Sequence, residues 1–87
     1  MYDITSYSLN RAKQRGLTIQ PSRKQFKKVD VYEHGVYVSS IGDTRYKDYP
    51  TYLRENGKKY ADERRRLYYE RHPHHTVRED LAKWILW

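Results

Sequence analysis

Tyrosine is the commonest large side chain available for a core in this chain of 87 residues, which has ten Tyr beside two Trp and one Phe. Each tyrosine combines a large apolar ring with a hydroxyl group that needs a hydrogen-bond partner or water when it is buried. We therefore expect a thin core that is partly polar at its edges. A chain of this length has room for one domain, which we place over residues 1–87.

Positive charge is concentrated in the first third of the chain. The formal net charge is +7, and residues 1–28 hold seven basic residues and one acid, whereas residues 29–87 hold eleven and ten. Such a concentration attracts polyanions, and a pI of about 9.7 is typical of nucleic-acid-binding domains. The alternative is a solvated surface whose charge only aids solubility. The expected phosphate contacts are Arg11, Lys13, Arg15, Arg23, Lys24, Lys27 and Lys28.

The N-terminal segment is typical of a helix. We expect this helix over residues 6–15, with a hydroxyl side chain at position 5 or 6 as its cap and Gly16 as the left-handed residue that ends it. Leu9 and Ala12 then face inward, while the basic residues spread over the outer surface. The stretch 17–19 follows as a short strand.

A β-hairpin is expected over residues 26–33 and 36–41, because they are rich in β-branched and aromatic side chains. His34-Gly35 lies between them as a two-residue turn. Counting outward from this turn pairs Tyr32 with Tyr37 and Val31 with Val38. The face of Val29, Val31, Val36 and Val38 is the expected core. The opposite face carries Lys28, Tyr32, Tyr37 and Ile41, and its tyrosines are candidates for base stacking.

The second half of the chain has a helical pattern. Asp48 is a cap and Pro50 suits the first turn of a helix that runs to about Arg71. Gly57 lies on the apolar stripe of this helix, where it either breaks the helix in two or allows a close contact with the sheet. We favour the contact. The stripe consists of Leu53, Gly57, Tyr60, Ala61, Leu67 and Tyr68.

A last helix follows a break at residues 72–75. Thr76 and Glu79 match the capping-box pattern, and residues 85–87 form an apolar end that we expect to be docked, on the core of this chain or on another subunit. The fold class is therefore α+β: a single small domain with an N-terminal helix, a hairpin or three strands, a long helix and a C-terminal helix. One side of the last helix carries Val77, Leu81, Trp84 and Ile85.

Several short motifs lie in the middle and at the end of the chain. They are Ser40-Ile41-Gly42, Tyr46 with Asp48-Tyr49-Pro50-Thr51-Tyr52, Gly57 with Tyr60-Ala61-Asp62, Arg64-Arg65-Arg66-Leu67-Tyr68, Arg71-His72, Leu81-Ala82 and Ile85-Leu86-Trp87. In these motifs the chain resembles a small uncharacterised protein family of large double-stranded DNA viruses that infect algae and amoebae. The resemblance implies a viral origin and one of two roles, a genome-associated protein or a minor virion component.

The chain departs from this family in two places. Members of the family have an acidic residue where His34 stands and a longer lysine-rich segment where Pro73-His74-His75 stands. The second difference removes positive charge, which argues against a binding role for that loop.

Arg64, Arg65 and Arg66 form a basic run on the long helix. Acidic neighbours favour pairing within the helix, and three consecutive helical residues point about 100° apart, so they do not form one cluster. Arg64 lies near the apolar stripe and remains a nucleic-acid-binding candidate.

His72, His74 and His75 suggest a metal site. They lie in a break between two helices, and a segment of this kind without cysteine is poor scaffolding for zinc, so we expect a loop and no metal or cofactor. The sequence lacks a nucleophile–base arrangement or a phosphate loop, so we do not expect an enzyme. No apolar run is long enough for a membrane span, and the first residues are unlike a signal peptide. We expect a location in the virion or in the host cytoplasm or nucleus, without secretion.

Two functions remain. The first is non-specific nucleic-acid binding, with DNA as the favoured class, through the N-terminal Lys and Arg residues and with Tyr32 or Tyr37 for stacking. The second is a minor virion or capsid structural protein that contacts a second copy or a capsid protein through Trp84, Leu86 and Trp87. The first function requires the N-terminal cations to lie together and unpaired, and cations that are scattered or paired with acids would favour the second.

Overall fold

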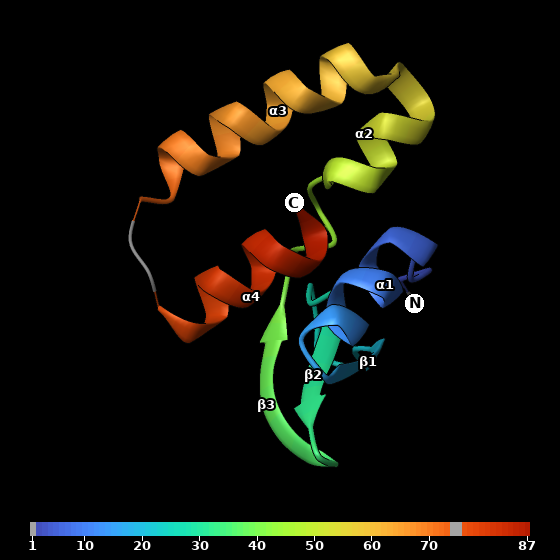
Figure 1. Cartoon of the computed structure of the whole chain (residues 1–87), viewed down its shortest axis with the longest axis vertical. Helices are drawn as coiled ribbons and strands as arrows, with labels where there is room; N and C mark the ends of the chain where they lie inside the picture. The colour runs from blue at the N-terminus through green and yellow to red at the C-terminus, as the bar shows by residue number, and fades with distance from the viewer. Residues whose placement is uncertain (1, 74–75) are drawn as a thin grey trace.

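The computed structural model describes residues 2–73 and 76–87 and confirms a small α+β domain (Figure 1). An antiparallel sheet in the order β1-β2-β3 lies at one end, α1 and α4 pack on it and on each other, and α2 and α3 pair at the other end. The elements are α1 (Ser6–Gln14), β1 (Leu17–Pro21), β2 (Val29–Glu33), β3 (Val36–Ile41), α2 (Tyr49–Asn56), α3 (Lys58–Arg71) and α4 (Val77–Leu86).

Local sequence signals set the hairpin turn and the starts of three helices as predicted, whereas the first hairpin strand begins at Val29 and not at residue 26. His34 and Gly35 have positive φ angles of 51° and 78°, as a type I′ hairpin turn requires. Side-chain oxygens cap three helices by accepting a backbone N–H three residues on. The caps are Thr5 for Ser8 at 3.2 Å, Asp48 for Thr51 at 3.1 Å, and Thr76 for Glu79 at 3.1 Å.

A β-bulge changes the register of the hairpin. Tyr32 pairs with Tyr37 as predicted, but Val31 pairs with Ser39, so the predicted pair of Val31 and Val38 is wrong. Val38 is the extra residue on β3, and one extra residue moves the following side chains to the other face of a strand. The sequence of the turn gave no signal for this extra residue.

The bulge also divides the predicted valine face. Val36 is 67% exposed and Val38 is exposed too, whereas Ile41, expected on the open face, is fully buried. The core face of the sheet is therefore built from one end of β3, from β2 and from Ile19 of β1. The buried apolar residues are Ala12, Ile19, Val29, Val31, Ile41, Tyr49, Ala61, Leu81, Ala82, Ile85, Leu86 and Trp87. Tyr49 is the one tyrosine among them, as a core with polar edges implies.

The predicted long helix is broken in two at Gly57. This glycine has a φ of 87° and ends α2, and a Cβ built on it would meet nothing within 4 Å. The favoured interpretation, a close contact with the sheet, is therefore wrong. The break folds α3 back along α2, and of the predicted stripe Ala61 is buried while Leu53 and Tyr60 are exposed.

Two further apolar residues expected in the core are exposed, namely Leu9 at 49% and Val77 at 67%. On α1 the inward positions belong instead to Ser8 and Ala12, whose small side chains let α1 approach α4 closely. The hydroxyl of Ser8 donates to the carbonyl oxygen of Ile85 at 2.9 Å, which fixes this approach.

The apolar end of α4 docks on the core of its own chain. Leu86 is 1% exposed, and the ring of Trp87 stacks on that of Tyr68 with centroids 4.3 Å apart and planes 9° apart. The Nε of Arg65 donates to the main-chain oxygen of Trp87 at 2.7 Å. These contacts connect α4 to α3 and dock residues 85–87 on the core of this chain, which is one of the two predicted docking partners.

Candidate nucleic-acid interface

The basic residues of the N-terminal third do not form one surface. Lys28 is only 4% exposed, and its Nζ donates to Oδ2 of Asp48 at 2.9 Å. Burial acts to raise the pKa of Asp48, but Lys28 and hydrogen bonds from Thr51 and Tyr2 outweigh burial and lower that pKa. Lys28 is therefore a buried structural cation and not the surface phosphate contact that the sequence suggested.

Arg11 and Arg15 belong to an arginine ladder, in which guanidinium groups alternate with the rings of Trp84 and Tyr7. The Cζ of Arg11 lies 3.7 Å from the centroid of Trp84 and 5.5 Å from that of Tyr7, and the Cζ of Arg15 lies 4.3 Å from Trp84. The Nε of Arg11 also donates to the carbonyl oxygen of Trp84 at 2.8 Å, and Arg15 pairs with Asp80 at 3.1 Å. The ladder thus joins α1 to α4.

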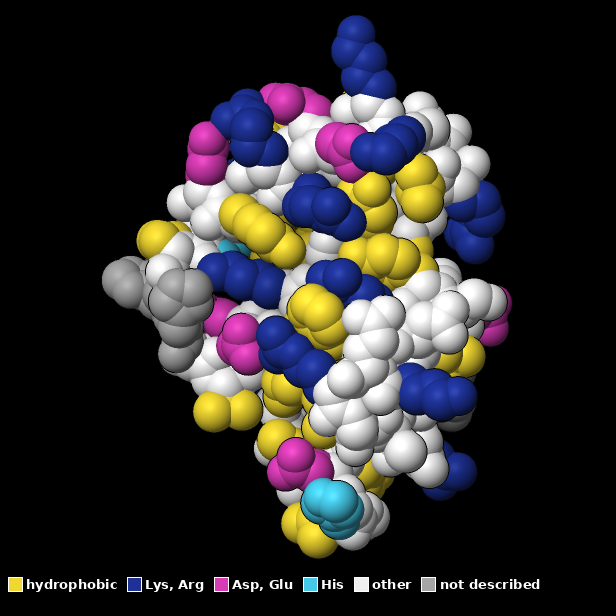
Figure 2. Space-filling model, viewed as in Figure 1, with side chains coloured by type: hydrophobic (Ala, Val, Ile, Leu, Met, Phe, Trp, Pro, Cys, Tyr) yellow, Lys and Arg dark blue, Asp and Glu magenta, His cyan; other side chains and the backbone are white. Residues whose placement is uncertain are grey.

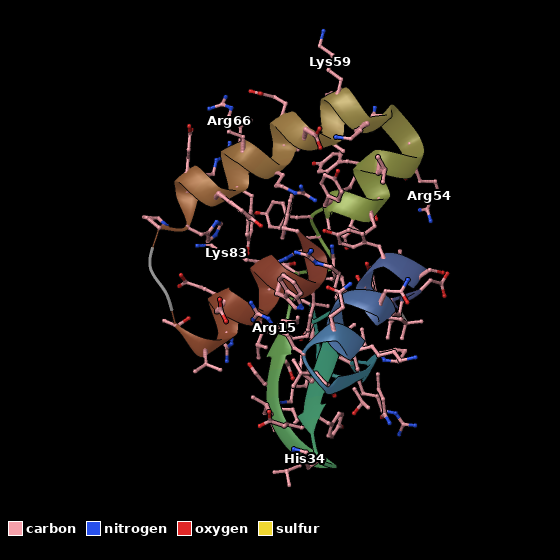
Figure 3. The ribbon with its side chains drawn as sticks, in the orientation of Figure 1. Arg15, His34, Arg54, Lys59, Arg66 and Lys83 are labelled. Carbon is pink, nitrogen blue, oxygen red and sulfur yellow. The ribbon has the colours of Figure 1, made fainter. Side chains whose placement is uncertain are left out.

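The arginine ladder lies on a face that carries basic, acidic and hydrophobic side chains. Figure 2 shows Lys and Arg side chains interleaved with hydrophobic ones down the middle of this face. Figure 3, in the same orientation, places Arg15 and Lys83 on it, whereas Lys59 and Arg66 point outward from α3. When a cation stacks on an aromatic ring and donates to a carbonyl oxygen, part of its charge and of its hydrogen-bonding capacity is already used within the protein.

Lys24 and Tyr37 belong to a polar chain on the sheet. The Nζ of Lys24 lies 2.6 Å from the hydroxyl of Tyr37, which bonds Ser40 at 2.7 Å, and Ser40 donates to Asp30 at 2.6 Å. The hydrogen bond from Lys24 lowers the pKa of Tyr37. Tyr32 meets the Tyr37 ring edge-on at 5.9 Å, so neither of these two candidate stacking rings stands alone. Lys13 and Arg23 are exposed on α1 and on the loop after β1.

A cleft of about 490 Å³ lies elsewhere, between α3, α4 and the loop that follows β3. This volume is typical of sites for small ligands. We call it the basic cleft. It is lined by Lys27, Lys28, Gly42, Asp43, Tyr46, Lys47, Tyr52, Arg64, Leu67, Tyr68, Arg71, His72, Arg78, Glu79, Ala82, Leu86 and Trp87.

Gly42 sets the distance between this loop and α4. Its φ is 79°, and a Cβ built on it would lie 2.6 Å from Cδ1 of Leu86 and 3.0 Å from Cδ of Lys28. Only glycine combines that left-handed conformation with so close an approach. Gly42 therefore allows the close contact with Leu86 of α4, and both residues line the basic cleft.

Four cations of the basic cleft make no ion pair within residues 2–73 and 76–87. The other cleft cations are paired: Lys28 with Asp48, and Lys47 with Glu55 at 2.6 Å. Asp43, which also lines the cleft, is held by Arg45 at 2.7 Å, and this bond lowers the pKa of Asp43 to about 2. The unpaired cations are Lys27, Arg64, Arg71 and Arg78.

Arg64 carries a specific unmet hydrogen bond. Its Nε is shielded from solvent and has no partner in the part of the chain that the structure describes, while its Cζ lies 5.3 Å from the ring centroid of Tyr52. A buried guanidinium donor without an acceptor is unfavourable. An anion bound in the cleft would supply that acceptor.

Aromatic rings form one side of the basic cleft. His72, Tyr68 and Trp87 are stacked in sequence with centroids 4.3 Å apart at each step, and Tyr46 is the most exposed ring at 70%. Burial, and then the charge of Glu79, raise the pKa of Tyr68 to about 12. The Tyr68 hydroxyl therefore stays protonated near neutral pH and can donate a hydrogen bond.

Two of the ten residues proposed from the sequence, Lys27 and Arg64, are among the unpaired cations of the cleft. Sequence reasoning missed Arg71 and Arg78. Arg64, Tyr68 and Arg71 have the spacing of one helical face, which is a usable signal. Arg78 has no such signal, because its position depends on how α4 folds back beside α3.

The arginine run behaves as predicted, with each side chain in a different place. Arg66 pairs with Glu63 and Glu70 at 2.6 Å, Arg65 lies 3.6 Å over the ring of Tyr49, and Arg64 lines the cleft. The pairing within the helix that the acidic neighbours favour is therefore confirmed for Arg66 alone.

No protein-family model matches the chain, and comparisons with curated proteins and with solved structures find no match. The viral resemblance therefore stays a prediction.

Among the described residues, no helix is long and apolar enough to cross a membrane, and no group of three or more His, Asp or Glu is placed to hold a metal ion. His74 and His75, part of the metal hypothesis, lie outside the described residues. The Nδ1 of His72 lies 3.0 Å from the carbonyl oxygen of Tyr68.

Proposed function

We propose that the protein binds single-stranded nucleic acid in the basic cleft, as a genome-associated protein of the kind that the sequence suggested. The observation that supports this most directly is the group of unpaired cations around one aromatic-walled cleft. Phosphate groups meet Lys27, Arg64, Arg71 and Arg78, and the buried Nε of Arg64 gains its missing acceptor.

A single strand fits this cleft better than a duplex does. A cleft of about 490 Å³ is too small for a double helix and admits a single strand. Unpaired bases can stack on aromatic side chains, and such stacking tolerates any base sequence. Tyr46, the most exposed ring of the cleft, is the first stacking platform.

The N-terminal cations are scattered and partly paired with acids, which by the criterion set from the sequence favours the second function, but the side chains assigned to assembly already make contacts within this chain. Leu86 and Trp87 are buried against their own chain, and Trp84 is stacked between Arg11 and Arg15. An assembly role stays a prediction without a surface assigned to it.

The test is a titration of labelled oligothymidylate with the protein at increasing salt, followed by fluorescence anisotropy. Each neutralised phosphate lowers the log–log slope by about 0.7 on single strands, so four cations predict a slope of about −2 to −3. Duplex DNA should bind more weakly at every salt concentration, and single-stranded RNA of the same length shows whether the sugar is distinguished.

A matched pair of double variants locates the site. Arg71→Gln with Arg78→Gln removes two cleft cations and should reduce the slope by about 1.4. Lys13→Gln with Lys59→Gln removes the same charge from exposed positions of α1 and α3 that do not line the cleft and should change the slope far less. Equal losses for the two pairs would mean that binding depends on total charge and not on the cleft.

A further inference from the structure

Among the described residues, Glu79 is an acid of the basic cleft that makes no ion pair. The Oε2 of Glu79 is shielded from solvent and has no hydrogen-bond partner among the described residues. In a complete capping box the Glu79 side chain would bond back to the amide of Thr76. The amide of Glu79 does donate to Oγ1 of Thr76, but no bond returns from the carboxylate.

An unpaired carboxylate restricts what the cleft can hold. A shielded carboxylate oxygen without a donor is unfavourable, and its charge repels phosphate. The same cleft presents the Nε of Arg64, which lacks an acceptor. A ligand that satisfies both must be anionic in one part and carry N–H donors in another. A nucleotide meets this description, with a phosphate for Arg64 and a base edge for Glu79.

Among the common bases, guanine presents the best-matched edge to a carboxylate. Its N1–H and its N2 amino group are adjacent donors and can reach the two oxygens of one carboxylate together. Adenine and cytosine place an acceptor nitrogen beside their single amino group, and thymine and uracil flank their one N–H with carbonyl oxygens. Each of these arrangements turns at least one acceptor toward the Glu79 carboxylate.

We propose that the basic cleft prefers guanine, with the Glu79 carboxylate accepting hydrogen bonds from N1–H and the N2 amino group of an unpaired base. This inference rests on the proposed function, because it needs a single strand bound in the cleft. The neighbouring stack of His72, Tyr68 and Trp87 provides a ring surface beside that acceptor.

The test measures competition for the cleft between oligothymidylates that differ in one central nucleotide: dG, dA, dC or deoxyinosine. The dG oligonucleotide should bind about tenfold more tightly than those with dA or dC, the discrimination typical of a bidentate pair. Deoxyinosine lacks only the N2 amino group, so it should fall between dG and dA. This series changes the ligand alone and does not depend on how a variant folds.

Two protein variants assign the preference to one residue. Glu79→Gln replaces one acceptor oxygen with a donor and should reduce the preference for dG to about twofold or less. Glu33→Gln removes the same charge from an exposed position of β2 that does not line the cleft and should preserve the preference. Circular dichroism confirms that each variant is folded.

The outcomes separate this inference from the proposed function. Equal affinity of the natural protein for all four oligonucleotides, or a dG preference that survives Glu79→Gln, overturns the guanine assignment and leaves single-strand binding in place. Failure to bind any oligonucleotide at low salt overturns both.

Discussion

The arginine ladder and the basic cleft have similar charge but differ in what their cations already bind. In the ladder, Arg11 and Arg15 stack on Trp84 and meet a carbonyl oxygen and Asp80. In the cleft, Arg64 has a buried N–H without an acceptor, and Arg71 and Arg78 make no ion pair in the described part of the chain. Positive charge alone therefore does not identify a binding surface, because a cation that holds the fold together is less available to a ligand.

This difference predicts that cations that stabilise the fold and cations that line the cleft respond differently to substitution, the first in stability and the second in affinity. Substitutions of the first kind should lower stability and spare affinity, and substitutions of the second kind should do the reverse. Five measurements test that separation, beginning with the largest expected effect.

Lys28→Ala should be the most damaging change. It leaves Asp48 buried without its cation, and breaking a buried ion pair in this way costs about 3–5 kcal/mol. Urea denaturation followed by tyrosine and tryptophan fluorescence measures the loss. A midpoint equal to that of the natural protein would mean that the pair adds nothing to the fold.

Gly42→Ala should destabilise the protein by about 2–3 kcal/mol, because the new methyl group overlaps Leu86 in a backbone conformation that alanine rarely adopts. Since Gly42 also sets the cleft wall, oligonucleotide affinity should fall in the folded fraction. Gly57→Ala has a similar φ but open space around it, so it serves as a control for backbone strain and should leave the affinity unchanged.

Arg11→Ala tests the arginine ladder. It removes a charged hydrogen bond to a carbonyl oxygen and a stacked guanidinium, which together contribute about 2 kcal/mol at a half-buried position. Its effect on oligothymidylate affinity should be less than twofold. A large drop in affinity with unchanged stability would instead place the binding surface on the ladder.

Tyr46→Ala tests the aromatic side of the basic cleft. Its ring is exposed and its removal should barely change the urea midpoint, whereas the loss of one stacked base should weaken oligonucleotide binding by about fivefold or more. The matched control is Tyr69→Ala on α3, which is also exposed and does not line the cleft. Similar losses of affinity for both would argue against stacking at Tyr46.

The smallest effect concerns pH. Because the pKa of Asp48 is lower in the folded protein than its ordinary value of 3.8, its ion pair stabilises the fold above that value, and this stability is lost as the pH falls through the folded pKa. The urea midpoint should therefore drop in acid. Lys28→Ala should show a smaller drop over the same range, and an identical drop in both proteins would assign the acid sensitivity to other carboxylates.

Sequence reasoning was most successful where a few adjacent residues determine the outcome. The caps at Thr5, Asp48 and Thr76 and the turn at His34-Gly35 needed no knowledge of distant residues, because each signal satisfies or bends its own backbone. Patterns over longer stretches were less reliable. The hairpin faces changed with one bulge at Val38, and the helical stripe was divided at Gly57.

The candidate site was the part least accessible to sequence reasoning. A count of basic residues in the N-terminal third drew attention to Lys28 and Arg11, which the fold uses for its own stability. The unpaired cations Arg71 and Arg78 come from residues 29–87, where eleven basic residues and ten acids concealed them. Pairing in space, and not composition, decides which charges remain available.

The sequence by itself determined the α+β class, the start of each capped helix, the hairpin turn and the excess of positive charge. These depend on backbone chemistry and on sums over residues, neither of which requires a packed structure. The tertiary structure alone decided that Lys28 is buried beside Asp48, that the apolar end of α4 returns to its own core, and that Arg64, Arg78 and Glu79 share one cleft. Those outcomes depend on which side chains meet after the chain has folded, because burial and pairing are properties of neighbours in space.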